Sequence, residues 1–365
     1  MMTNQTKSTH FKALTGIRAI AAIMIFLYHN RKYWKDDLHP ELFRFCNELN
    51  LGVPLFFVLS GFLIANNYGI QPASSFGHYK NYIMQRIVRI MPLYWLLLTC
   101  YYLDPRFGKF HFSIPHYLLL HGFSFKHSLD AIAQSWSLTV EMTFYAFAPV
   151  LLVLLYKKWM YLLGFLVALF LVSIGIGVFW NSVNGNTSCY MYPVDFVLMG
   201  TFAGQSIFFA AGILLSYYAK QFQSLPFQKH ATSIGALGFI ITLYCIGLFQ
   251  ESRVDHGTNH WPGKLLFFIV VPFFITMLFQ GLMNQRTYLQ RLLSSKIMMV
   301  LGNASFAFYL VHISYANLKI KSVVFFPDRN FVLLWVVSIA LYYGFEKPIY
   351  DYYRKITKKP QLLNK

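Results

Sequence analysis

Long apolar runs, each bounded by charged residues, glycine or proline, constrain this chain more than any other feature of its sequence. A helix needs roughly 20 apolar residues to cross a hydrocarbon layer of ~30 Å. The 365 residues therefore hold material for about ten crossings joined by short loops. Only 12% of the residues are charged, against about 25% in soluble domains. We therefore exclude an ordinary water-soluble domain and predict an all-α bundle of about ten transmembrane helices.

The predicted helices follow the apolar runs. They cover residues 13–29, 51–67, 90–103, 136–156, 159–180, 194–218, 231–250, 264–283, 297–316 and 331–346. We expect a single membrane domain over residues 1–350 and a basic cytoplasmic tail over residues 351–365. No small-residue cleavage site follows the first apolar run, so we expect this helix to remain uncleaved.

The charge of the chain is strongly positive, with 31 Lys and Arg residues against 13 Asp and Glu residues. Most of the basic residues fall in inner segments if the N-terminus is cytoplasmic, which predicts that both termini lie in the cytoplasm. Basic residues dispersed between apolar runs are topology signals, so we expect no nucleic-acid partner. A cationic inner face would also concentrate a phosphate-rich cytosolic ligand. Composition alone is compatible with either role for these charges.

The four cysteines form neither a CxxC pair nor a ligand-like spacing with histidine, so we expect no metal site. Cys46 and Cys189 fall in loops that the predicted topology places on the same outer side. They are either a disulfide or two separate free thiols.

Two titratable residues share the first predicted helix. Charged side chains are costly in an apolar span and are therefore functional candidates. Arg18 and His29 are 11 residues apart, which is about three helical turns and ~16 Å along one face. Gly16 and neighbouring alanines would let other helices approach this helix closely. The alternative is that Arg18 extends to the inner headgroups and that His29 caps the outer end.

Two arginines precede the third predicted helix. Arg86 and Arg89 are spaced i and i+3, so their guanidinium groups are neighbours on a helix. Paired guanidinium groups suit the oxygens of a phosphate. Ordinary anchoring by positive charge at the inner boundary explains the pair equally well.

Two further titratable residues lie in later apolar runs. Glu141 needs a proton or a partner, which is either an arginine on another helix or His29, whose protonated form it would stabilise. His312 lies in the run 297–316, where a functional role and simple packing are comparable alternatives.

These segments together resemble the membrane-bound acyltransferase-3 family, over residues 11 to 349. Each motif is weak alone, but their ordered combination is specific. In chain order the motifs are Arg18-x10-His29, Gly52-Val-Pro-Leu-Phe-Phe-Val-Leu-Ser-Gly-Phe62, Arg86-x-x-Arg89 with Pro92, Trp136-Ser137-Leu-Thr-Val-Glu141 with Tyr145, Tyr309-Leu-Val-His312 and Glu346-Lys-Pro348.

The resemblance implies transfer of an acyl group, usually acetyl, from cytosolic acyl-coenzyme A to a hydroxyl of an envelope saccharide or lipid-linked glycan. It implies acyl-CoA as a donor substrate, no permanently bound cofactor, and a location among the lipids of the bacterial plasma (inner) membrane. It also implies that the pair Arg86 and Arg89 helps hold the nucleotide end of the donor and that His29 is catalytic.

Geometry and resemblance together give one hypothesis for the site. His29 is the general base, Glu141 supports it, and Arg18 joins the arginine pair at the donor phosphates. Further site candidates are Trp136, Ser137, Tyr145 and His312. Two other classes remain open: a transporter or flippase of a lipid-linked saccharide, in which the buried charges line a permeation route, and a structural scaffold.

Overall fold

The computed structural model describes residues 4–34, 38–68, 76–104, 113–184, 191, 193–224, 226–253, 255–313 and 327–358. These residues are overwhelmingly helical and contain no β-strand. Within them, nine helical segments are long and apolar enough to cross a membrane. A tenth apolar helix, α15 (Lys296–Val311), is shorter. The predicted all-α, multi-pass bundle is therefore confirmed.

The nine segments follow the predicted apolar runs, with different boundaries. They are Lys12–Asn30, Pro40–Tyr68, Tyr79–Leu103, Ser135–Lys157, Trp159–Val183, Val194–Tyr217, Gln228–Gly247, Trp261–Asn284 and Asn330–Thr357.

The third predicted helix was placed too short. It corresponds to α4 (Phe76–Leu103), which includes the basic segment around Arg86 and carries Pro92 inside. Hydropathy detects only the apolar half of such a helix, because the polar turns before it need not lie in hydrocarbon.

The predicted helix 194–218 is divided into α8 (Val194–Gly200) and α9 (Phe202–Tyr217) by an extended residue, Thr201. The interruption leaves carbonyl groups at the end of α8 without helical donors. The Gln205 Nε2 group lies 3.2 Å from the Leu198 oxygen and 3.0 Å from the Met199 oxygen, and donates to both. A single buried amide thus supplies hydrogen bonds to two carbonyl groups at the break, as a low-dielectric environment requires.

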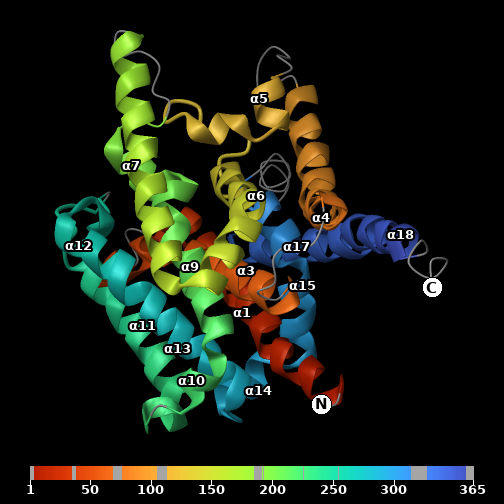
Figure 1. Ribbon diagram of the computed structural model, residues 1–365. Helices are drawn as coiled ribbons and strands as arrows, with labels where there is room; N and C mark the ends of the chain where they lie inside the picture. The colour runs from red at the N-terminus through yellow and green to blue at the C-terminus, as the bar shows by residue number, and fades with distance from the viewer. Residues whose placement is uncertain are drawn as a thin grey trace. The chain divides into compact units, whose positions relative to one another are not determined.

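The chain forms two compact units. The first contains residues 1–68 and 207–306. In it α1 (Asn4–Asn30) packs on α3 (Gly52–Tyr68), α13 (Val271–Asn284) and α14 (Tyr288–Leu293). α11 (Ala231–Gly247) runs along α13, as Figure 1 shows in green and cyan.

Small residues allow the close packing of α1, as the sequence predicted. A Cβ atom added to Gly16 would lie 2.0 Å from the carbonyl oxygen of Leu293, so no larger residue fits there without movement of the backbone.

The second compact unit contains residues 69–206 and 307–365. In it α6 (Ser135–Lys157) packs on α4, α7 (Trp159–Val183) and α8. The C-terminal helices are α17 (Pro327–Leu341) and α18 (Lys347–Lys358), and α18 packs on α4. The last predicted helix is therefore longer than expected, since helical backbone continues through the π-turn η8 (Tyr342–Glu346) into α18.

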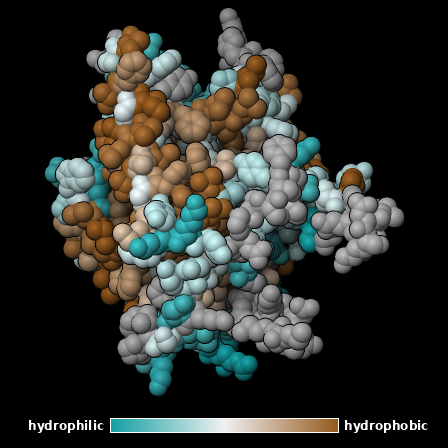
Figure 2. Space-filling model, in the orientation of Figure 1, coloured by the Kyte–Doolittle hydropathy of each residue, from teal (hydrophilic) through white to brown (hydrophobic). Residues whose placement is uncertain are grey.

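α7 shows which surface meets lipid. Its outer face carries exposed apolar side chains, which form a brown strip in Figure 2 where α7 lies in Figure 1. They include Val167, Leu171, Val172, Ile176 and Phe179. A continuous exposed apolar face of this kind is the signature of a membrane contact.

Candidate functional site

α1 carries two predicted site residues of the first unit. Arg18 is half-buried in the middle of the helix, whereas His29 is exposed one residue before the helix ends. Because α1 is one uninterrupted helix, the 11 residues between them correspond to ~16 Å along its axis. The exposed imidazole of His29 thus lies at one end of α1 and Arg18 lies near its middle.

The residues on both sides of His29 are fixed by contacts that the sequence analysis missed. The Tyr28 hydroxyl lies 3.2 Å from Nε2 of His256. Arg31 donates from Nη1 to the Tyr28 carbonyl oxygen at 2.7 Å, and its Cζ lies 4.0 Å from the centroid of the Tyr28 ring. The end of α1 is thus tied to the loop that contains His256.

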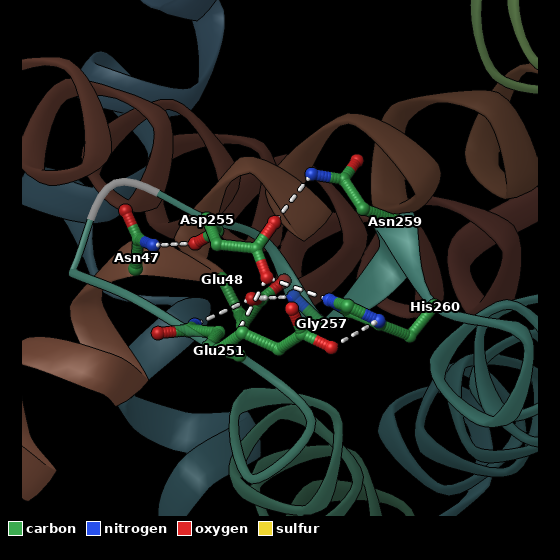
Figure 3. A network of polar contacts seen from close by, with 8 residues as sticks. Asn47, Glu48, Glu251, Asp255, Gly257, Asn259 and His260 are labelled. Atoms are coloured by element: carbon green, nitrogen blue, oxygen red, sulfur yellow. Dashed lines mark hydrogen bonds and ion pairs between the residues drawn. The ribbon is translucent and has the colours of Figure 1, made fainter.

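This loop, described over residues 250–253 and 255–260, is held by the end of α2 (Pro40–Asn47) and the residue after it (Figure 3). Glu48 is fully buried, and its Oε1 accepts hydrogen bonds from Gln250 Nε2 at 2.6 Å and from the Gly257 amide at 2.7 Å. Asn47 accepts from Arg31 Nε and donates to the Asp255 carbonyl oxygen. Asn47 therefore links the loop to the segment after His29.

The Asp255 carboxylate accepts three hydrogen bonds from other residues of the loop. It accepts from the Glu251 amide at 3.0 Å, from Asn259 Nδ2 at 2.7 Å and from His260 Nε2 at 2.6 Å. His260 Nδ1 lies 3.7 Å from Glu251 Oε1. Figure 3 shows these contacts converging on one carboxylate.

The charge states in the loop follow from these contacts. Burial raises the pKa of Asp255, but the hydrogen bonds outweigh it and hold that pKa well below its ordinary value. Burial, followed by the positive charge of Arg31, lowers the pKa of His256. Asp255 is therefore ionised and His256 neutral near pH 7.

In the second unit, three predicted residues form a cluster between α4 and α6. The Tyr145 hydroxyl donates to Glu141 Oε1 at 2.5 Å, one helical turn away on α6. The Arg86 Cζ lies 5.5 Å from the centroid of the Tyr145 ring and 5.7 Å from that of Tyr82. Arg86 and Glu141 thus share Tyr145 as a neighbour.

Two other predicted residues meet at Tyr309, which was quoted in a motif but not selected as a site residue. The Ser137 Oγ lies 2.6 Å from the Tyr309 hydroxyl. His312 donates from Nδ1 to the Tyr309 carbonyl oxygen at 2.7 Å. Gln134 Nε2 donates to the same carbonyl at 2.9 Å and to that of Leu310 at 2.7 Å.

The remaining predictions are placed as follows. Arg89 lies one turn after Arg86 on α4 and is half-buried, as is Trp136 on α6.

The predicted pairing of Glu141 with His29 joins residues of different compact units and stays a prediction. Cys46 is a free thiol, which agrees with the second of the two alternatives for the cysteines, and Cys189 lies outside the described residues. Among the described residues, no group of three or more His, Cys, Asp and Glu side chains could hold a metal ion.

Comparison with known proteins assigns a family to this arrangement. A family model described as an acyltransferase domain matches residues 11–345. A protein of Staphylococcus aureus strain COL, named as a predicted O-acetyltransferase, is 26% identical over 91% of this chain and 56% of its own length. The O-acetyltransferase OatA of Staphylococcus aureus strain NCTC 8325 is 22% identical over 83% of this chain and 50% of its own length. The chain therefore spans about half the length of these curated relatives, and no solved structure matches it.

Proposed function

The chain belongs to the acyltransferase-3 family, and on this premise we propose that it moves an acetyl group from cytosolic acetyl-CoA to a hydroxyl of an envelope saccharide or lipid-linked glycan. The observation that carries the proposal is His29, an exposed imidazole at the end of α1. Its neighbour Tyr28 contacts His256 through the hydroxyl and accepts a hydrogen bond from Arg31. The names of the relatives, which describe O-acetyltransferases, support the same reaction class.

The proposed step needs one base. A neutral hydroxyl is a poor nucleophile, so His29 removes its proton while the oxygen attacks the thioester carbonyl. A C–O bond forms, the C–S bond breaks, and the coenzyme A thiolate leaves with the proton that the imidazolium returns. Glu141 is the proposed carboxylate that stabilises the protonated imidazole.

The proposed donor site uses the arginines. Arg86 and Arg89 lie one turn apart on α4, and the Tyr82 and Tyr145 rings flank the Arg86 guanidinium. Such neighbours restrict the guanidinium, and a guanidinium fork suits phosphate oxygens. Arg18 is the proposed third contact. This assignment requires the start of α4 to face the cytosol, with the chain in the plasma membrane and both termini in the cytoplasm.

A transfer assay tests the proposed function. Purified full-length protein in lipid nanodiscs is incubated with acetyl-CoA labelled in the acetyl group and with envelope saccharides from cells that lack the gene. We expect label in the saccharide that mild base releases, as it does from an O-ester. Retention of all label in acetyl-CoA would contradict the proposal. Movement of an unmodified lipid-linked saccharide across vesicles by the same protein would instead support the transporter alternative.

The donor site makes a separate prediction. Arg86→Ala and Arg89→Ala should each raise KM for acetyl-CoA, because each removes a contact to phosphate. The effect should shrink as salt is added, since salt already weakens this interaction in the wild type. Lys158→Ala, which removes an exposed basic residue before α7, is the matched control. Equal KM values for acetyl-CoA in wild type and both arginine variants would contradict the donor site and explain the arginines as topology signals.

A further inference from the structure

We propose that the loop residues 250–253 and 255–261 bind the saccharide that is acylated, with the Trp261 ring stacking on a sugar face near the end of α1. This inference rests on the proposed function and assigns its acceptor site. None of these residues was singled out by the sequence analysis.

The first observation is the contact between this loop and Tyr28, the residue before His29. The Tyr28 hydroxyl, on the residue before His29, lies 3.2 Å from His256 Nε2, and their ring centroids are 5.6 Å apart. His256 and Trp261 are five residues apart, so their Cα atoms lie within about 18 Å even in a fully extended chain. The 3-10 turn η6 (Gly257–Asn259) shortens that distance. A saccharide on Trp261 therefore lies within a few sugar units of the end of α1.

The second observation is that the described residues of this loop are tied down by hydrogen bonds. Glu48 and Asn47 hold it from one side, and the Asp255 carboxylate ties together its beginning and end. The backbone also packs closely, because a Cβ atom on Gly257 would lie 1.8 Å from the carbonyl oxygen of Ile246. A loop tied down in this way loses little conformational entropy when a ligand binds.

The third observation is the chemistry of the exposed surface. Trp261 is 70% exposed and begins the short helix α12 (Trp261–Leu265). Lys264 Nζ lies 5.2 Å from the centroid of its ring, and Lys264 itself is buried. One ring face is thus backed by a cation while the ring remains open to a ligand.

Polar side chains precede this ring along the chain. The Glu251 side chain is 81% exposed, Asn259 is exposed, and His260 is 28% exposed. A carboxylate accepts hydrogen bonds, and an amide both donates and accepts them. An exposed flat ring that follows such groups in the same loop matches a saccharide, which offers apolar C–H faces and hydroxyl edges.

The competing explanation is membrane anchoring. Trp261 is the first residue of the apolar segment Trp261–Asn284, and tryptophan is enriched where a span meets water. Trp159 provides a matched comparison, because it is also exposed and also begins a helix at the edge of an apolar segment. Anchoring predicts the same behaviour for both tryptophans.

Steady-state kinetics separates these explanations. The full-length protein in nanodiscs is assayed with labelled acetyl-CoA and increasing amounts of envelope saccharide from cells that lack the gene. For Trp261→Ala we expect KM for the saccharide to rise about tenfold, the loss of one ring-stacking contact. KM for acetyl-CoA and kcat should stay close to wild type. Trp261→Phe, which keeps a ring, should restore most of the saccharide affinity, and Trp159→Ala should behave as wild type.

Equal saccharide KM values for Trp261→Ala and Trp159→Ala would overturn the inference and identify Trp261 as a membrane anchor. Should Trp261→Ala fail to fold, an unchanged saccharide KM in the Glu251→Gln and Asn259→Ser variants would overturn it. Absence of labelled saccharide with the wild type itself is a different result, because it refutes the proposed function and this inference together.

Discussion

His121 shows how a single buried side chain links pH to the stability of the second unit. It lies in the loop between α4 and α6, only 3% exposed, with Nε2 2.8 Å from the Ser135 Oγ. Burial, followed by the positive charge of His116, lowers the pKa of His121 from an ordinary 6.5 to about 4. The unfolded chain therefore takes up a proton at a higher pH than the folded chain does.

This difference predicts acid sensitivity. The stabilising contribution of neutral His121 is fully present above pH 6.5 and is lost as the pH falls toward 4. Each pH unit inside that window lowers the free energy of unfolding by at most about 1.4 kcal/mol. Tm of His121→Gln should fall less than that of wild type over this range, whereas exposed His230→Gln should follow wild type. Identical pH profiles for wild type and His121→Gln would disprove this role.

Individual residues also mark what sequence reasoning could find. Arg18, His29 and Glu141 were selected as candidates because charge is unusual in an apolar run, and their roles stay predictions. Glu48, Asp255 and His256 were missed, because polar residues in a loop are ordinary until three-dimensional contacts show that they are buried or shared.

At the scale of elements, close packing of α1 makes a direct prediction. Gly16→Ala places a methyl group 2.0 Å from a backbone oxygen of Leu293, so α1 and the end of α14 must move apart. We expect the free energy of unfolding to fall by about 1–3 kcal/mol, as for other overpacked sites. Gly164→Ala on α7 is the control, since a Cβ there meets nothing within 4 Å. Thermal unfolding in detergent measures both, and an equal Tm for the two variants would contradict the packing account.

Helix positions were predictable because the length of an apolar run has a physical meaning in a bilayer. Helix ends and interruptions were not. The polar first half of α4 adds no hydrophobicity, and the break at Thr201 depends on the Gln205 amide reaching two carbonyl groups of α8. Neither arrangement leaves a hydropathy signal.

For the whole molecule, membership of the acyltransferase-3 family agrees with the motif order predicted from the sequence. The proposed roles are distributed over the chain: Arg18 and His29 belong to the first compact unit, and Arg86, Arg89 and Glu141 belong to the second. Sequence spacing could suggest each role, but it could not reveal Tyr145 between Arg86 and Glu141, because that contact joins two helices.

The most direct measurement is the initial rate of acetyl transfer by His29→Ala, with His230→Gln as the matched exposed histidine. Because His29 is exposed, its removal should leave Tm close to wild type. Loss of a general base should lower the rate about 10²–10⁴-fold. A folded His29→Ala protein that transfers acetyl groups as fast as wild type would contradict the account.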